Sequence, residues 1–94
     1  MAKVTWSSFA HEDVEIIAAY IARDSEYAAS RFVDKLFNAT DKLLDHPLIG
    51  RVVPERNDAR IREIFCGSYR IIYRIEKSTV WIVGVIHGAR NWKP

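Results

Sequence analysis

The last third of the chain contains three apolar, β-branched segments separated by two residues each. The segments are residues 60–66, 69–76 and 79–87, and the separating pairs are Gly67-Ser68 and Lys77-Ser78. Two-residue loops of this kind join antiparallel strands into hairpins. The spacing therefore predicts a three-stranded antiparallel meander, which limits the possible folds more than any other feature of the chain.

The residues before the meander predict one short strand and a pair of helices. Residues 3–6 are typical of a strand, and Ser7 or Ser8 can cap a helix whose apolar residues repeat at helical spacing. Asp24-Ser25 ends this helix and can cap a second one, which His46-Pro47 closes because proline disfavours a helical residue before it. Residues 50–58 are expected to be a polar connector.

The order β-α-α-β-β-β predicts an α+β fold in which a helical hairpin packs on one face of a small, mainly antiparallel sheet. Ninety-four residues suffice for one modest core, so a single domain over residues 1–94 is expected. The longest apolar run, residues 80–86, is too short to cross a bilayer, and residues 1–6 lack the apolar core of a signal peptide. We therefore expect a cytoplasmic protein with no membrane partner.

Metal and cofactor chemistry have no recognisable motif in the sequence. The single Cys66 has no cysteine partner for a disulfide or a zinc site, and no Gly-rich phosphate loop occurs. No metal and no cofactor are expected.

The two halves of the chain carry opposite charge. Residues 1–47 hold five Lys or Arg against eight Asp or Glu, and residues 48–94 hold nine against four. The basic half coincides with the predicted meander, so nucleic acid or an acidic protein is the favoured partner. A solubilising scatter of charges is the alternative.

The turns also predict which side chains share a face of the meander. With Lys77-Ser78 as the complete loop, Ile75 lies opposite Val80 and Tyr69 opposite Ile86, which creates an apolar face suited to the helices. The other face, here called the open face, then gathers Glu63, Arg70, Arg74, Trp81 and His87, with Arg90 just beyond the last strand.

The side of Arg62 depends on the first turn. If Gly67-Ser68 is also a complete loop, Glu63 lies on the open face and Arg62 points to the helix side, near its rim. A bulge or a longer turn would exchange the two residues.

Arginines inside apolar strands must be solvated, paired or bound to an anion. On the open face they could grip phosphate, while Trp81 could stack on a base or under Arg74. The alternative is an exposed face with solvated arginines and one Arg74–Trp81 cross-strand contact. The apolar residues Ile72, Val83 and Val85 between the charges favour a face that a partner covers.

Glu63 and His87 allow a catalytic hypothesis. A carboxylate and an imidazole beside arginine could cleave RNA, one taking the 2′-hydroxyl proton and one protonating the leaving oxygen, without a metal. The alternative is that these are ordinary residues of a small protein. His11 and His46 are interpreted as surface or capping residues.

Several motifs occur together and in order along the chain. They are Trp6, Pro47-x-x-Gly50-Arg51-x-Val53-Pro54-Glu55, Ile61-Arg62-Glu63, Gly67-Ser68-Tyr69-Arg70-Ile71-Ile72-Tyr73-Arg74 and Val85-Ile86-His87-Gly88-Ala89-Arg90. With them the chain resembles the RelE/ParE superfamily of bacterial type II toxin–antitoxin (plasmid stabilisation) toxins. The resemblance implies the fold above and a cognate antitoxin whose flexible segment wraps the toxin in a hetero-oligomer.

The superfamily contains two mechanisms, and the resemblance points to different residues for each. RelE-like toxins cut messenger RNA on the ribosome; Arg70 and Arg90 match two of their arginines, but Ile61 and Glu63 stand where they carry basic residues. A further ribonuclease branch uses Glu, Arg and His. As a ribonuclease, this chain would use Glu63, Arg70, His87 and Arg90.

The signature as a whole is more similar to the ParE branch, whose members inhibit DNA gyrase and trap it on cut DNA. Such toxins are growth-arresting binders and not nucleases. The resemblance then implies that the target or the antitoxin is bound by Arg62, Arg70, Arg74, Trp81 and Arg90.

Overall fold

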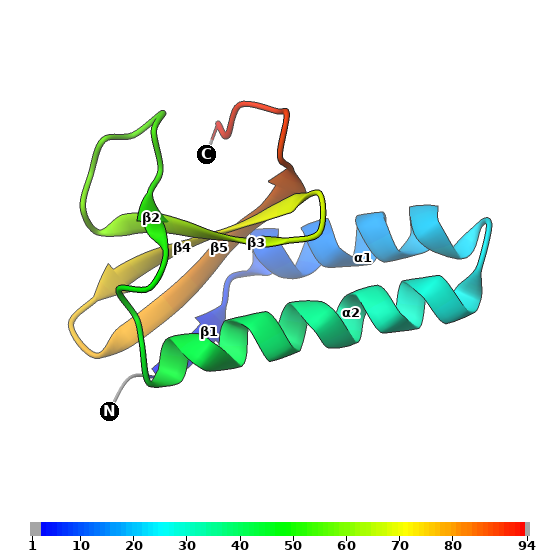
Figure 1. The fold of residues 1–94 in the computed structure, drawn as a ribbon, viewed down its shortest axis with the longest axis horizontal. Helices are drawn as coiled ribbons and strands as arrows, with labels where there is room; N and C mark the ends of the chain where they lie inside the picture. Colours follow the sequence, from blue (N-terminus) through cyan, green and yellow to red (C-terminus); the bar gives the residue numbers. More distant parts are fainter. Residues whose placement is uncertain (1–2, 94) are drawn as a thin grey trace.

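The computed structural model describes residues 3–93, in which two helices pack on a five-stranded mixed sheet (Figure 1). The elements are β1 (Lys3–Trp6), α1 (Ser8–Ala22), α2 (Glu26–Asp41), the 3-10 turn η1 (Lys42–Leu44), β2 (Arg51–Val52), β3 (Ile61–Cys66), β4 (Tyr69–Glu76) and β5 (Thr79–His87). The predicted fold class is confirmed. The segment predicted to be a connector, residues 50–58, differs in one respect: it contains the short strand β2.

Both helices begin where the sequence predicts. Ser7 accepts a hydrogen bond from the Ala10 amide at 3.1 Å, and Ser25 accepts one from the Ala28 amide at 3.0 Å. Each serine is in an extended conformation, so its side chain satisfies an amide that the first helical turn leaves free.

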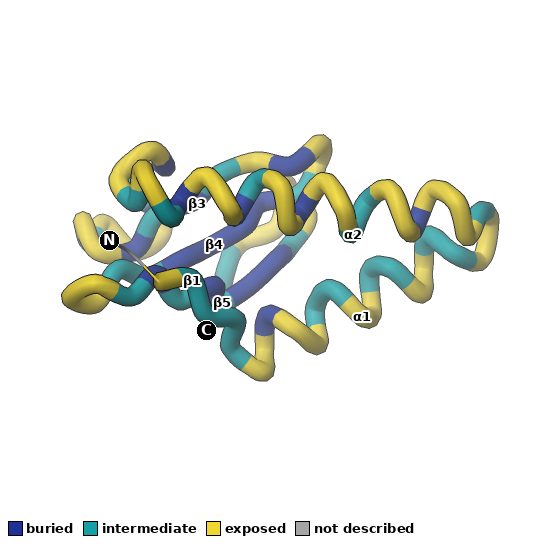
Figure 2. Tube along the Cα trace, turned by 90° about the horizontal axis from the view of Figure 1, so that it is seen from below, coloured by how far each residue is buried: buried dark blue, intermediate teal, exposed yellow. Residues whose placement is uncertain are grey.

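The sheet has the order β1-β5-β4-β3-β2, with β1 parallel to β5 and every other pair antiparallel. The helices cover one face of it (Figure 1). The main core lies between them and contains Leu36 and Leu43 from the helical segment and Ile71, Tyr73 and Ile82 from the sheet. Figure 2 shows the buried residues concentrated along β4 and β5, whereas the helices are mostly exposed or intermediate.

The predicted register holds from the β4–β5 turn only as far as Tyr73, which pairs with Ile82. Ile72 then pairs with Gly84, so Val83 is an extra residue in β5 and forms a β-bulge. One added residue moves every later side chain to the opposite face. Tyr69 consequently lies opposite His87, and the predicted pairing of Tyr69 with Ile86 is wrong.

A second, smaller core lies on the open face. It contains Val53, Ile61 and Ile72, with Ile86 and Trp92 packed against it. The loop before β3 and the segment after β5 both lie on this side of the sheet, away from the helices (Figure 1). The open face is therefore partly covered by the chain itself.

Candidate functional site

Arg70 is the centre of a buried ion-pair network on the open face. Only 4% of the residue is exposed. Its Nε donates to Glu63 Oε1 at 2.6 Å, and its Nη1 and Nη2 donate to the two oxygens of Glu55 at 2.8 and 2.9 Å. Nη1 also donates to the Arg90 carbonyl oxygen at 2.9 Å. Of the alternatives for these arginines, which were solvated, paired or bound to an anion, Arg70 is paired, because four of its five N–H groups have acceptors within the protein.

Glu63 is held between two arginines. Its Oε1 accepts from Arg70, and its Oε2 accepts from Arg51 Nε at 2.5 Å. Arg51 stands opposite Glu63 because β2 pairs with β3, and its guanidinium also lies over the Phe65 ring at 5.3 Å. The Glu63 side chain has no exposed surface, so both oxygens are reserved for these pairs.

Glu55 joins this network to the end of the chain. Its Oε2 accepts from the Trp92 amide at 3.0 Å in addition to its bond from Arg70. The hydrogen bond from Arg70, followed by the one from the Trp92 amide, lowers the pKa of Glu55 to about 2. Glu55 and Glu63 in turn raise the pKa of Arg70.

His87 is not part of this network. After the bulge it turns to the helix side, where its ring packs edge-on against Tyr69 at 5.7 Å and lines a shallow cavity with Ile17 and Tyr20. Its Nδ1 accepts from the Ala89 amide at 3.3 Å. The prediction that His87 shares the open face with Glu63 is wrong, since the Val83 bulge was not visible in the alternation of apolar residues.

Arg62 lies on the helix side near the rim, as the two-residue turn predicts. Cys66 pairs directly with Tyr69 across that turn. Arg62 donates from Nε to the Ala59 carbonyl and from Nη1 to the Gly50 carbonyl, both at 2.9 Å. The sheet thus separates Arg62 from Arg74 and Trp81, although all three were predicted to bind the target or the antitoxin.

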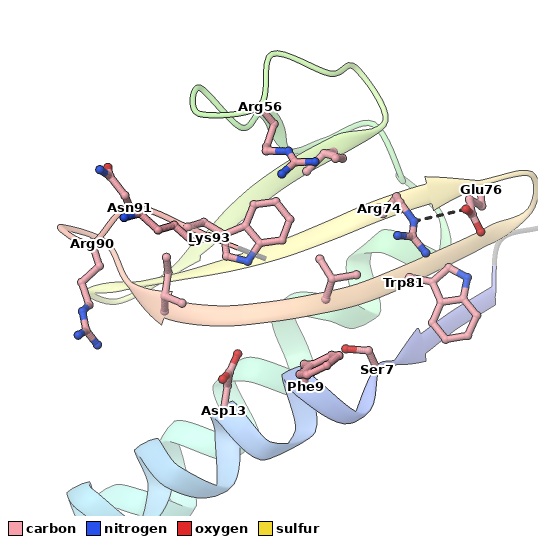
Figure 3. Close-up of a pocket in the computed structure, with 14 residues that line it drawn as sticks. Ser7, Phe9, Asp13, Arg56, Arg74, Glu76, Trp81, Arg90, Asn91 and Lys93 are labelled. Carbon is pink, nitrogen blue, oxygen red and sulfur yellow. Dashed lines mark ion pairs between the residues drawn. The ribbon is translucent and has the colours of Figure 1, made fainter.

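A groove of about 1100 Å³ crosses the open face (Figure 3). Arg74 and Trp81 are cross-strand partners in it, as predicted, and Arg90 lies at its border. The other lining residues are Ser7, Phe9, Asp13, Arg56, Ile61, Glu76, Val83, Ile86, Asn91, Trp92 and Lys93.

Several of these residues were missed because the sequence does not show what the loop and the C-terminal segment cover. Arg56 lies over the Trp92 ring at 5.5 Å, which places a second indole in the groove. The visible signal was a tryptophan in an otherwise polar segment, two residues after Arg90.

The groove is predominantly basic. Arg56, Arg74, Arg90 and Lys93 border it, against Asp13 and Glu76. Arg74 Nε lies 3.4 Å from Glu76 Oε1, yet this buried nitrogen has no hydrogen-bond acceptor. Asp13 Oδ2 accepts from the Val85 amide at 3.0 Å, and burial raises the pKa of this carboxyl.

The described residues offer no site for a metal. Among residues 3–93, no three His, Cys, Asp or Glu side chains come together in a way that could hold an ion. No helix in this part of the chain has the length and apolarity needed to cross a membrane.

Two solved structures share the fold across most of this chain. The chromosomal ParDE toxin–antitoxin system of P. aeruginosa has a chain that superposes with a TM-score of 0.76 at 16% identity, covering 93% of this chain and 96% of that one. The toxin–antitoxin complex RelBE2 of Mycobacterium tuberculosis gives a TM-score of 0.59 at 23% identity, covering 92% and 96%.

Sequence comparison identifies the family. Toxin RelE2 of Caulobacter vibrioides is 35% identical over 91 residues, which cover 96% of this chain and 99% of that protein. The putative toxin Y4kP of Sinorhizobium fredii is 34% identical over 92 residues, covering 96% and 92%. A family model of the ParE toxin of the type II toxin–antitoxin system parDE matches residues 4–92. The chain therefore belongs to the ParE toxin family of type II toxin–antitoxin systems.

Proposed function

We propose that this toxin stops growth by binding and inhibiting DNA gyrase, and that a cognate antitoxin neutralises it by direct contact. The proposal rests on the family and on one observation in particular. Glu63 and Arg70, which an RNA-cleaving site would need to move a proton and to bind the phosphate, are buried and bound to each other.

A general base must come within about 2.6–3.2 Å of the proton that it removes. Both Glu63 oxygens are occupied by arginines, and Glu55 already pairs with the Nη1 and Nη2 groups of Arg70 that a two-pronged phosphate contact would use. His87, the other candidate proton carrier, lies on the opposite side of the sheet. This arrangement favours a protein that binds over one that cuts.

The groove residues Arg74, Trp81 and Arg90 are the best placed of the predicted set to contact a target or an antitoxin. Arg62 would contribute separately, at the rim of the helix side. An antitoxin partner, and with it a hetero-oligomer, is supported by the solved neighbours, which are a ParDE toxin–antitoxin system and a RelBE2 toxin–antitoxin complex. The basic half of the chain suits an acidic antitoxin segment.

Ribosome-dependent cleavage of messenger RNA is the second candidate. The observation in its favour is that one relative carries the name Toxin RelE2. Arg90 is also exposed, and Arg70 contacts only its backbone carbonyl. Its guanidinium could therefore reach a phosphate of RNA.

Inducing the chain alone in a bacterial host separates the two candidates. Gyrase inhibition predicts filamentation, an SOS response and cleaved DNA while bulk messenger RNA stays intact. In vitro, the purified chain should reduce gyrase supercoiling. Rapid translation arrest with cuts inside ribosome-bound messages, and without cleaved DNA, would refute the proposal.

A further inference from the structure

Helix α1 carries large apolar side chains on the side that faces away from the core. Val14 and Ile17 pack against the main core. In contrast, Phe9, Ile16 and Tyr20 are 76%, 60% and 66% exposed. Figure 2 shows exposed residues recurring along α1. Because helices that are apolar on all sides are normally buried, the outer side of α1 is suited to contact with another protein surface.

The outer side of α2 has a different character. Its exposed residues are mostly charged or polar and include Arg31, Asp34, Lys35 and Asn38. Its exposed aromatic rings have neighbours within the chain, since Tyr27 lies under the Arg31 guanidinium and Phe37 packs against Trp6. This composition is typical of a helix that faces water. The apolar outer side therefore belongs to α1 and not to the helical layer as a whole.

Five exposed residues of α1 follow a seven-residue repeat. Phe9, Ile16 and Arg23 are seven residues apart, and Glu12 and Ala19 follow the first two of them by three residues. Arg23 directly follows the last residue of α1 and keeps a helical conformation. Residues with this spacing form one stripe, through which two helices can pack. These five residues are here called the α1 seam.

The charges of the α1 seam make it complementary to itself in the antiparallel direction. When a second α1 is placed antiparallel with Ile16 opposite Ala19, Glu12 lies opposite Arg23 of the second copy. A two-fold axis then repeats the same ion pair. A parallel arrangement would instead bring Glu12 against Glu12 and Arg23 against Arg23. The small side chain of Ala19 lets the two helix axes approach closely.

We propose that the α1 seam is the interface of a homodimer, in which two copies of this chain pack through antiparallel α1 helices. Phe9 and Tyr20 alone expose on the order of 300 Å² per copy. With Ile16 and the flanking side chains, two copies bury about 1,000 Å², which is the lower limit for a specific interface. We therefore expect a weak dimer, with a dissociation constant of roughly 1–100 μM.

The α1 seam and the groove on the open face are largely separate surfaces. Of the five residues of the seam, only Phe9 also borders the groove. None of the residues predicted to bind the target or the antitoxin belongs to the seam. The inference thus goes beyond inhibition of gyrase and does not depend on it.

An acidic antitoxin segment is the competing occupant, and the charge of α1 disfavours it. The helix contains Glu12, Asp13 and Glu15 and has no Lys or Arg between its first and last residues. A segment rich in carboxylates would be repelled over the first half of the helix. A second copy of this chain avoids that repulsion, because it brings one Arg23 to each Glu12.

Sedimentation equilibrium of the purified full-length chain tests the inference. Between about 1 and 500 μM, the average mass should rise from the monomer value of 10.9 kDa toward twice that value. Ile16→Glu places an unpaired carboxylate at the centre of the interface and should raise the dissociation constant more than about 30-fold. Leu48→Glu is the matched control, because Leu48 is a 65% exposed aliphatic residue outside α1, and the dissociation constant should not change. Thermal unfolding shows whether both variants remain folded.

Reversing the charges tests the antiparallel register. Glu12→Arg and Arg23→Glu should each raise the dissociation constant about 5- to 30-fold, because each replaces two ion pairs with two like-charge contacts. The double variant Glu12→Arg, Arg23→Glu recreates both pairs with opposite sign and should return the constant to within about threefold of the original. A parallel dimer would show no such recovery. A purely local effect of either charge on α1 would also persist in the double variant.

Three outcomes would overturn the inference. They are a monomer at every concentration, equal effects of Ile16→Glu and Leu48→Glu, and a double charge variant that dimerises no better than the single variants. Because gyrase and antitoxin are absent from these measurements, a negative result leaves the supercoiling test of the proposed function unaffected.

Discussion

Glu55 and Arg70 form a two-pronged ion pair, at 2.8 and 2.9 Å, across 15 residues of sequence. Glu55 belongs to the loop before β3, and Arg70 to the middle of the sheet. The pair brings the loop, the sheet and the C-terminal segment together, since Arg70 and Glu55 also bind the backbone of Arg90 and Trp92. It organises the open face from a buried Arg70 and a Glu55 that remains at the surface.

Glu63→Gln should destabilise the fold strongly. The substitution leaves the buried Arg70 without one of its two countercharges, and breaking a buried pair in this way costs about 3–5 kcal/mol. The free energy of unfolding from chemical denaturation measures the loss. The matched control is Glu76→Gln, where the pair is exposed and the change should stay within about 0.5 kcal/mol. Equal effects of the two substitutions would contradict a structural role for the network.

Acid should weaken the fold through Glu55. Its pKa is about 2 in the folded chain against an ordinary 4.5, so the unfolded chain binds the proton first. The stabilisation is complete above pH 4.5 and is lost as the pH falls toward about 2. In Glu55→Gln, the free energy of unfolding should start lower and fall less over this range. Parallel pH profiles of the two proteins would show that Glu55 is not the responsible group.

Gly50→Ala should be poorly tolerated. A Cβ at this position would lie 2.6 Å from both the Glu63 carbonyl oxygen and the Tyr73 hydroxyl, which accepts from the Gly50 amide and donates to the Pro47 carbonyl. We expect a loss of about 3 kcal/mol in the free energy of unfolding. Gly67→Ala is the comparison: space is open there, and only the φ of 57° opposes a side chain, at about 1–2 kcal/mol. A larger loss at Gly67 would refute the close packing at Gly50.

Asp13 should matter to the bulge in β5. Its carboxylate accepts from the Val85 amide, which lies just beyond the residue that interrupts the ladder. Asp13→Ala should therefore speed hydrogen exchange at the Val85 amide and lower the free energy of unfolding by about 1–3 kcal/mol. Asp13→Asn keeps an acceptor oxygen and should cost less. Unchanged exchange in Asp13→Ala would show that water or another group satisfies this amide.

The fold was predictable because its signals are local. Ser7 and Ser25 mark the helix starts, Gly67-Ser68 and Lys77-Ser78 mark the turns, and alternation defines the faces near those turns. Arg74 and Trp81 lie where the register predicts, and Arg62 lies on the side that a complete two-residue turn implies, one of the two alternatives left open.

The ion pairs of the site were not predictable, because they depend on contacts between residues far apart in the sequence. Nothing near Arg70 in sequence shows that Glu55 will pair with it, because that contact depends on how an irregular loop folds back. β2 was missed because two residues carry too little alternation to signal a strand. The Val83 bulge was missed because apolar residues stand on both sides of β5, so a change of face leaves no trace in the pattern.

The bulge at Val83 has a consequence for how such chains diverge. Without that residue, the ladder would continue as it leaves the β4–β5 turn, and the imidazole of His87 would stand on the same side as Glu63. A single-codon deletion or insertion in this strand would therefore move the His87 side chain from one face of the sheet to the other, while the order of the strands stays the same. Length variation at this position is a route by which related toxins could gain or lose an acid–base pair in one step.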